Sequence, residues 1–187
     1  MKMRVFAGIQ AAHHKIRLFI AVDCGELKDY FLEIQKKLPK VDLSLVKGFH
    51  LTLKFLGEVQ PSDATKISSE LRKIKFEEFD FHLEKTGYFE RKNEISILWI
   101  GIKPEDKAMK LQEEVDETLK DYFDKEKGYR PHITLARVKN IENKNEFLKN
   151  FNNIQIEKKK IKVINFKLMQ SILTSQGLVN KEVEVFS

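Results

Sequence analysis

Cysteine is almost absent from this chain of 187 residues, in which Cys24 is the single thiol. One cysteine excludes an intramolecular disulfide, and no combination of cysteine and histidine has the spacing of a zinc site. Folds that depend on disulfides or on structural zinc are therefore excluded. The composition is typical of a reducing compartment, so we expect a cytoplasmic protein and interpret Cys24 as a small core residue.

Long apolar runs are absent as well. The longest, at residues 18–22 and 95–102, have the length of a strand, whereas a helix that spans a membrane needs about 20 apolar residues. Residues 1–15 lack the apolar segment of a signal peptide and precede the first predicted strand. We expect no contact with a membrane, and we interpret 1–15 as an N-terminal extension or a remnant of cloning.

No stretch rich in glycine or serine divides the chain, which contains 8 glycines and 4 prolines. Hydrophobic residues make up 42% of the sequence and charged residues 33%, a balance that suits a soluble chain with a sizeable core. We therefore expect residues 16–187 to form a single domain with two lobes.

Positive charge is in excess, since 34 lysines and arginines stand against 28 aspartates and glutamates, for a formal net charge of +6. Such an excess favours association with a polyanion but does not bear on the fold. The basic residues are scattered along the chain, and we interpret the cluster at 158–160 as solvated surface.

One short pattern occurs twice, as His50-Leu51-Thr52-Leu53 and as His132-Ile133-Thr134-Leu135. The two histidines lie 82 residues apart, too far for one helix or hairpin, so only the tertiary fold can bring them together. Alternate side chains of a β-strand point to opposite faces. Each copy therefore predicts a strand with histidine and threonine on one face and two apolar anchors on the other.

The duplication is the informative part of this signal. A His-apolar-Ser/Thr-apolar tetrapeptide is expected by chance in roughly one chain of this length in ten, and two copies in roughly one in several hundred. A single copy is most simply a buried strand whose histidine is hydrogen-bonded. Two copies with matched flanks favour a shared active site over that interpretation.

The second half of the chain repeats the order of predicted elements in the first. Phe19 precedes His50 by 31 residues and Trp99 precedes His132 by 33, so the spacing repeats too. The pattern predicts an α+β fold of two pseudo-symmetric lobes, with antiparallel sheets that flank a central groove and helices on the outside. The predicted strands cover 17–22, 50–55, 79–90, 95–102, 132–138, 162–173 and 182–186, and the predicted helices cover 26–38, 61–74, 104–123 and 143–151.

Longer strings around the two motifs resemble the 2H phosphoesterase superfamily, and specifically the RNA 2′,3′-cyclic phosphodiesterases, also called 2′-5′ RNA ligases. The resemblance covers nearly all of the chain after residue 15 and is carried by the segments 17–23, 49–59, 88–89, 98–101, 130–137 and 171–174. One segment departs from it: where relatives commonly have Gly-Pro-x-Tyr, this chain has Gly177-Leu178-Val179-Asn180. The motifs that carry the catalytic residues of the family are intact.

The resemblance implies a pair of catalytic histidines. In-line attack at phosphorus requires a base near the entering water and an acid near the leaving oxygen, and imidazole suits either task near neutral pH. By similarity, His50 is the acid that protonates O3′ and His132 is the base that activates water, although the pseudo-symmetry permits the reverse. Thr52 and Thr134 are expected to donate hydrogen bonds to the non-bridging phosphate oxygens.

Three further residues are candidates for substrate binding. Lys54 follows Thr52 by two residues, so strict alternation turns it toward the phosphate. Phe55 and Arg137 each lie five residues after a motif histidine, where strict alternation turns them away. By resemblance, Phe55 meets the nucleobase and Arg137 grips phosphate, which requires a bulge or a strand end nearby. The alternative for both is packing in the core.

The other polar and aromatic candidates are interpreted as structural: Arg130, His82, Trp99, Asp63, Asp106 and Asp116. The three aspartates do not have the spacing of metal ligands. We expect no metal and no other cofactor.

These interpretations predict a metal-independent RNA 2′,3′-cyclic phosphodiesterase that opens terminal cyclic phosphates to 2′-phosphates, with weak reverse 2′-5′ ligation. The expected partners are RNA ends of this kind, tRNA fragments among them, and the expected state is a monomer. Two other functions are compatible with the motifs: a non-catalytic module that binds RNA ends, and a phosphoesterase for a small cyclic nucleotide such as ADP-ribose 1″,2″-cyclic phosphate. A metal site is disfavoured because two histidines alone rarely form one.

Overall fold

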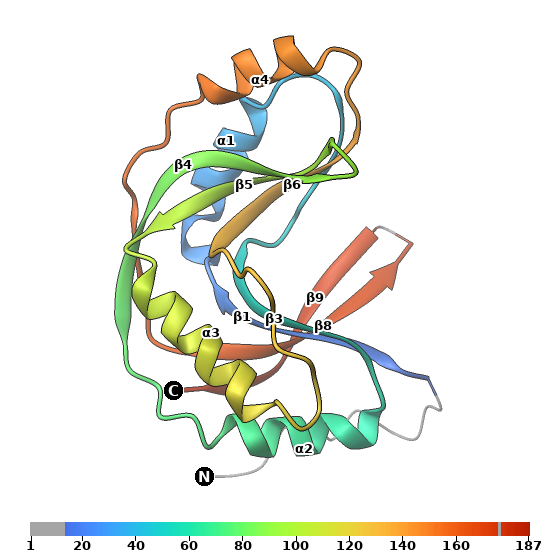
Figure 1. Cartoon of the computed structure of the whole chain (residues 1–187), viewed down its shortest axis with the longest axis vertical. Coiled ribbons are helices and arrows are strands. Elements are labelled where there is room, and N and C mark those ends of the chain that lie inside the picture. Colours follow the sequence, from blue (N-terminus) through green and yellow to red (C-terminus); the bar gives the residue numbers. More distant parts are fainter. Residues whose placement is uncertain (1–13, 176) are drawn as a thin grey trace.

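The computed structural model of the protein describes residues 14–175 and 177–187 (Figure 1). The predicted extension at 1–15 lies almost entirely outside the described residues. The strands are β1 (Ile16–Asp23), β2 (Asp42–Leu45), β3 (His50–Val59), β4 (Phe79–Arg91), β5 (Glu94–Lys103), β6 (His132–Asn140), β7 (Lys160–Val163), β8 (Phe166–Thr174) and β9 (Gly177–Phe186). The helices are a short 3-10 helix (Gly25–Leu27), α1 (Lys28–Lys36), α2 (Pro61–Leu71), α3 (Asp106–Thr118) and α4 (Lys144–Asn152).

The described strands form one nine-stranded antiparallel sheet with two lobes. Its order is β7-β4-β5-β6-β3-β1-β8-β9, and β2 pairs with β6. At the centre, β6 and β3 meet through one register pair, Leu51 with Ile133. Figure 1 shows β5 and β6 in the upper part of the molecule and β3, β1 and β8 in the lower part. The predicted α+β fold with two antiparallel lobes is confirmed.

The lobes do not follow the order of the chain. β4 precedes the second repeat in sequence but pairs with its first strand, β5, whereas β8 lies near the C-terminus and pairs with β1. The pairing of β4 with β5 results from the tight hairpin that joins them. Its central residues Lys92 and Asn93 both have positive φ, at 53° and 64°, as in the type I′ turn that matches the twist of two antiparallel strands. Each lobe is therefore completed by a strand from the other half of the chain.

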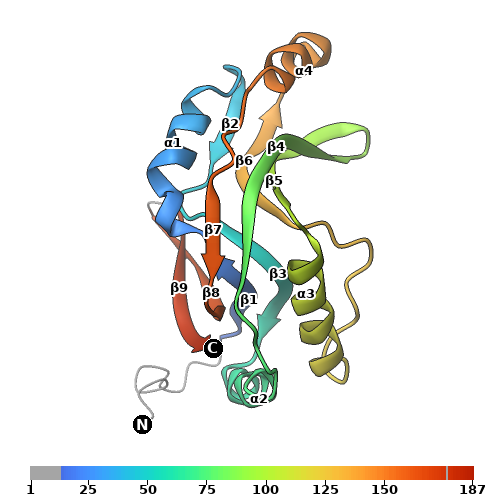
Figure 2. The same cartoon turned by 90° about the vertical axis from the view of Figure 1, so that its left-hand side faces the viewer.

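The helices lie outside the sheet, as predicted. Figure 2 shows α1 and α3 on either side of the strands and α2 and α4 at the two ends. Each helix buries one apolar stripe, for example Phe31 and Ile34 of α1 and Leu111 and Val115 of α3. α1 packs on β6 and α3 on β3, so each helix contacts the motif strand of the other repeat. Among the described residues, no helix has the length and apolar character needed to cross a membrane.

Three strands differ from the prediction, and the first is β9, which begins at Gly177 and not at 182. The segment predicted as one strand at 162–173 is divided, because β7 ends at Val163 and pairs with β4 while β8 begins at Phe166 and pairs with β1. Apolar and polar residues alternate on both sides of the break, so periodicity does not show that the chain crosses between lobes there. β2 was not predicted at all, since it is short and largely exposed and therefore lacks a buried face.

Candidate active site

Strand β3 carries a bulge three residues after His50. Two consecutive residues of β1 face Lys54 and Thr52, which leaves Leu53 as the extra residue of the bulge. A bulge of one residue shifts the alternation of the strand. Lys54 is consequently buried, at 3% exposure, whereas Phe55 is exposed on the face that carries the motif.

Strand β6 repeats this bulge at the equivalent position. Two consecutive residues of β5 face Ala136 and Thr134, which leaves Leu135 as the extra residue, three positions after His132. Ala136 is buried and Arg137 is exposed. The sequence of buried and exposed residues is the same from His50 to Phe55 as from His132 to Arg137. The two strands therefore share their irregular geometry as well as their sequence pattern.

The bulges decide the placement of the three second-tier residues. Phe55 and Arg137 are turned to the side of the motif histidines and threonines, and the bulge that this placement requires is present in both strands. The predicted orientation of Lys54 toward a phosphate is wrong, because the same bulge turns it into the interior. Strict alternation predicts neither the orientation of Phe55 and Arg137 nor that of Lys54, because nothing in the tetrapeptides marks a bulge.

The two motifs come together at the junction of the lobes. Leu51 and Ile133 form the register pair between β3 and β6, and both are fully buried. The residues on either side of this pair project to the opposite face. In an antiparallel pair, each histidine is thereby carried toward the threonine of the other strand. The fold thus assembles two histidines and two threonines from segments that are distant in sequence.

His132 has a defined tautomer. Its Nδ1 lies 2.7 Å from the backbone oxygen of Arg130, and a carbonyl only accepts, so Nδ1 carries the proton and Nε2 is left with a lone pair. Phe89 meets the imidazole edge-on with ring centroids 4.8 Å apart, and Trp99 lies 6.1 Å away. Burial lowers the pKa of His132. A neutral imidazole with a free Nε2 is the form that a general base requires.

His50 has different neighbours. The ring of Phe19 packs against it at 5.0 Å between centroids, and Asp23 is its register partner in β1. Burial lowers the pKa of His50 to about 4, with the charge of Asp23 opposing the shift and the nearby His132 adding to it. Asp23 is held in place by the Gly25 N–H, which donates to Oδ1 at 2.8 Å, and by Lys167, whose Nζ lies 3.0 Å from Oδ2.

Two cavities adjoin the histidine pair. The first, of about 160 Å³, is called here the aromatic cavity and is lined by Thr52, Leu53, Lys54, Phe55, Phe89, Glu126, Gly128, Tyr129, Arg130 and His132. The second, of about 230 Å³, is called the lysine cavity and is lined by Ala21, Asp23, Gly25, Lys28, Lys47, Gly48, Phe49, His50, Lys167, Met169 and Asn180. His132 therefore lies at the aromatic cavity and His50 at the lysine cavity, and the residues that line the two cavities differ in chemistry.

A buried polar network lies behind the aromatic cavity. Lys54 Nζ donates to Asp116 of α3 at 2.5 Å and to the backbone oxygen of Asp124 at 2.6 Å. Asp116 also accepts from Gln112 at 2.7 Å and from the backbone N–H of Glu126 at 2.9 Å. Burial raises the pKa of Asp116, but these donors, Lys54 first, outweigh burial and hold it below its ordinary value. Lys54 therefore ties the segment before β6 to β3.

Two side chains that the sequence interpretation missed satisfy carbonyls near the bulges. The Tyr129 hydroxyl donates to the backbone oxygen of Thr52 at 3.0 Å, and Gln35 Nε2 donates to that of Leu135 at 2.8 Å. A bulge removes ladder hydrogen bonds, so such carbonyls need other donors when buried. Tyr129 lies three residues before His132, next to a segment that carries the family resemblance, which was the available signal.

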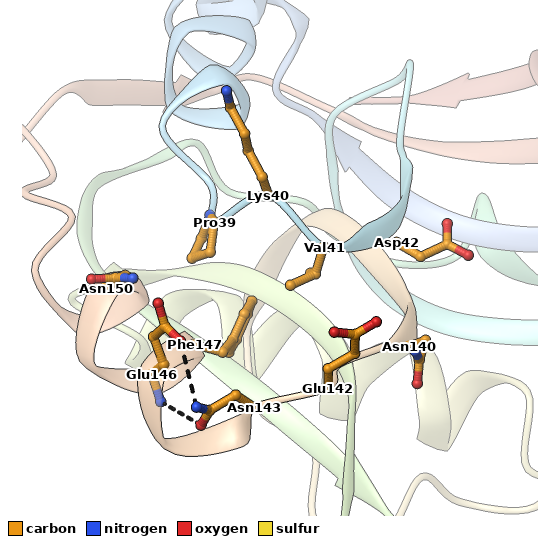
Figure 3. A pocket seen from close by; sticks show the side chains of 10 residues that line it. All are labelled: Pro39, Lys40, Val41, Asp42, Asn140, Glu142, Asn143, Glu146, Phe147 and Asn150. Carbon is orange, nitrogen blue, oxygen red and sulfur yellow. Dashed lines mark hydrogen bonds between the residues drawn. The ribbon is translucent and has the colours of Figure 1, made fainter.

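A further cavity lies away from the two histidines. It has a volume of about 520 Å³ and is lined mainly by the α1–β2 connection and by residues at and near α4 (Figure 3). None of the predicted site residues lines it.

The predicted structural residue Trp99 is 7% exposed and packs in its lobe. Within the part of the chain that the structure describes, no group of three or more histidine, cysteine, aspartate or glutamate side chains is placed to hold a metal.

The internal repeat is also recognised by similarity to known proteins. A family model described as LigT like Phosphoesterase matches the chain twice, at residues 22–99 and 100–179. The chain belongs to the LigT-like phosphoesterase family. The two matches meet inside β5 and each contains one His-x-Thr motif. The predicted membership of the 2H phosphoesterases is therefore confirmed.

Relatives with curated names cover nearly the whole chain. An RNA 2′,3′-cyclic phosphodiesterase of Thermotoga maritima is 36% identical over 89% of this chain and 92% of its own length. A protein of the same name from Archaeoglobus fulgidus is 33% identical over 91% of this chain and 99% of its own. Among solved structures, TT0787 of Thermus thermophilus has a TM-score of 0.77 at 25% identity and covers 92% of this chain and 97% of its own. E. coli LigT complexed with 3′-AMP, at a TM-score of 0.71 and 22% identity over 92% and 97% of the two chains, shares the fold.

Proposed function

We propose that this protein is an enzyme that hydrolyses the 2′,3′-cyclic phosphate at the end of an RNA to a 2′-phosphate. The observation that carries the proposal is the pair of equivalent bulged strands, which brings His50, Thr52, His132 and Thr134 to the junction of the two lobes. The name shared by the curated relatives supports the choice of substrate.

His132 acts as the general base. Its Nδ1 proton is committed to the Arg130 carbonyl, so the lone pair of Nε2 accepts the proton of the attacking water. Attack at phosphorus proceeds in line with departure of O3′, so the acid must stand on the opposite side of the phosphate. We assign this role to His50, on the other strand.

His50 acts as the general acid when the substrate is bound. Burial disfavours its charged form, but the negative charge of a bound cyclic phosphate favours that form and raises the pKa of His50. His50 then gives its proton to O3′ while His132 takes one from water, and proton exchange with solvent restores the starting protonation of both imidazoles. Since the two imidazoles interact, their titrations belong to the pair.

The remaining residues bind substrate. The hydroxyls of Thr52 and Thr134 donate to the non-bridging oxygens, where charge accumulates in the transition state. Arg137, exposed on the motif face, adds positive charge, and the exposed ring of Phe55 supplies a stacking surface for a base. With a 5′-hydroxyl in place of water, the same acid and base open the cyclic phosphate at O3′ and join the two RNA ends through a 2′-5′ linkage.

The biological setting follows from the same chemistry. A 2′,3′-cyclic phosphate forms only on ribose, so RNA fragments, including those of tRNA, are the expected partners. The protein is expected to act as a monomer, because one chain contains both histidines, and in the cytoplasm, where its lone thiol stays reduced.

One assay tests the proposal. An oligoribonucleotide that ends in a 2′,3′-cyclic phosphate is incubated with the protein in excess EDTA, and the product isomer is identified by chromatography. We expect turnover to a 2′-phosphate. Loss of turnover that magnesium restores would overturn the metal-free mechanism, and a 3′-phosphate product would overturn the assignment of the leaving oxygen.

Two parallel reactions distinguish the alternatives. Binding of the oligonucleotide without turnover would indicate a module that only holds RNA ends. Higher kcat/KM for ADP-ribose 1″,2″-cyclic phosphate than for the oligonucleotide would indicate an enzyme for small cyclic nucleotides. The variant His82→Ala serves as a control, since His82 lies in β4 away from the motif strands and is expected to leave turnover unchanged.

A further inference from the structure

The lysine cavity beside His50 has a cationic lining that the catalytic step does not use. Lys28, Lys47 and Lys167 contribute three ammonium groups, against one carboxylate from Asp23. Its counterpart beside His132 is lined by three aromatic rings, by Lys54, which is paired with Asp116, and by Arg130 and Glu126, which carry opposite charges. The surroundings of the two histidines are therefore specialised for different parts of a ligand.

The single carboxylate of the lysine cavity is already paired. Asp23 accepts from the Gly25 N–H through Oδ1 and from Lys167 through Oδ2. Lys167 also forms an ion pair with Glu182, at 2.9 Å, so its ammonium group is held between two carboxylates. The side chains of Asp23 and Lys167 are thus held in place by their mutual contacts on one side of the cavity. The exposed Lys28 at the start of α1 provides positive charge at the cavity.

Asn180 adds a neutral donor. Its Oδ1 accepts from the Ser171 hydroxyl at 3.1 Å, and among the described residues its amide nitrogen donates to no acceptor. That nitrogen faces Gly48, since a Cβ built on Gly48 would lie 3.6 Å from it. Both residues line the cavity. Asn180 is the last residue of the segment in which this chain departs from the Gly-Pro-x-Tyr pattern of its relatives.

The size of the cavity limits the ligand. Its volume of about 230 Å³ lies below the roughly 300–1,000 Å³ that is typical of sites for whole small molecules. A phosphate with the adjoining edge of a ribose is compatible with this volume, and ammonium groups with an amide N–H are suitable donors for it.

The direction of the reaction places a second phosphate on this side. In-line displacement puts water on the side of the base and the departing O3′, with its ribose, on the side of the acid. With His50 as the acid, the ribose of the terminal nucleotide lies on the side of the lysine cavity. Its 5′-oxygen leads to the next phosphate of the strand.

We propose that the lysine cavity binds the phosphate on the 5′ side of the terminal nucleotide, with Lys28 and the Asn180 amide nitrogen as donors. This inference rests on the proposed function and on His50 as its acid. The protein would then distinguish the end of an RNA strand from a free cyclic nucleoside by this second anion.

A pair of substrates that differ by one group tests the proposal: adenosine 2′,3′-cyclic phosphate with a 5′-hydroxyl, and the same compound with a 5′-phosphate. The expected kcat/KM is about tenfold higher for the 5′-phosphorylated compound, the order of one charge-assisted hydrogen bond. Lys28→Ala and Asn180→Asp should each remove most of this gain. Lys149→Ala, an exposed lysine of α4, is the matched control and should retain it.

The outcomes are separable. Equal kcat/KM for the two compounds with the unaltered protein would overturn the second phosphate site while leaving the proposed function intact. A gain that persists in Lys28→Ala and Asn180→Asp, or that Lys149→Ala removes equally, would also overturn it. If neither compound nor a cyclic-ended oligonucleotide is hydrolysed, the proposed function itself fails.

Discussion

The His50 strand and the His132 strand have the same backbone irregularity but different surroundings. Both carry a bulge three residues after the histidine. Around His132 the neighbours are Trp99, Phe89 and a backbone carbonyl. Around His50 they are Phe19 and a carboxylate, Asp23. The shared bulge gives equivalent side chains of the two strands the same orientation. The neighbours differ: the backbone carbonyl leaves His132 with a free Nε2 that can accept a proton, whereas His50 lies beside the negative charge of Asp23.

The difference arises from the partner strands. β1 supplies Phe19 and Asp23 to β3, and β5 supplies Trp99 to β6. These strands are equivalent in the pseudo-symmetric sheet but not in sequence, since β1 places Ala21 opposite Thr52 where β5 places Trp99 opposite Thr134. The residues next to the two histidines therefore give them different roles, acid and base, within a pseudo-symmetric fold.

Removal of either histidine should have the largest effect. His50→Ala and His132→Ala are each expected to lower turnover by at least about a hundredfold, the scale of one positioned acid or base. A substrate with sulfur in place of the leaving O3′ separates the two roles, because a thiolate departs without protonation. Activity on it should recover in His50→Ala and stay low in His132→Ala. Recovery in His132→Ala instead would reverse the assignment.

Loss of the ion pair behind the aromatic cavity should be the next largest effect. Lys54→Met leaves Asp116 buried without its cation, which typically costs about 3–5 kcal/mol of unfolding free energy. Denaturant titration measures this change. Lys110→Met, which removes an exposed pair with Glu114 at 3.8 Å, is the control and should change stability by no more than about 1 kcal/mol.

A double variant tests the reason for that loss. Lys54→Met combined with Asp116→Leu removes both charges and should recover part of the lost stability, because no unpaired carboxylate remains. A double variant that is as unstable as Lys54→Met alone would show that packing, and not the charge, accounts for the effect.

Alanine substitutions at two glycines beside Trp99 should have a smaller effect on stability, and the two variants can be compared with each other. A Cβ on Gly87 would lie 2.1 Å from the indole ring, whereas one on Gly101 would lie 3.4 Å from it. Gly87→Ala must displace the ring and is expected to cost about 1–3 kcal/mol, with lower turnover because Trp99 lies beside His132. Gly101→Ala should cost less by both measures. Similar losses in the two variants would show that the position of the indole is unimportant.

The pH dependence of stability provides a last test of the histidine surroundings. Burial lowers the pKa of His50 to about 4 and also lowers that of His132, so the unfolded chain binds protons more readily. The histidines' contribution is fully present above their ordinary pKa of about 6.5 and is lost as the pH falls toward 4. The denaturation midpoint of His50→Gln should fall less over this range. Identical slopes for the variant and the unaltered protein would contradict the burial of His50.

Much of the fold could be read from periodicity because the elements concerned have one buried face. The helices and the strands on either side of each motif fall in this class. β2 has no buried face to mark it, and the crossing between β7 and β8 leaves the alternation intact. Local patterns reflect burial, whereas strand partners depend on which distant edge is available for hydrogen bonding.

The sequence by itself determined the two histidines, the two threonines and the family, because a duplicated tetrapeptide with matched spacing carries that information. Only the tertiary structure decided where Lys54, Phe55 and Arg137 point, since a bulge depends on the register with β1 and β5. It also decided that Lys54 binds Asp116, 62 residues away. A buried charge needs a partner, and the chain finds that partner only when α3 packs on β3.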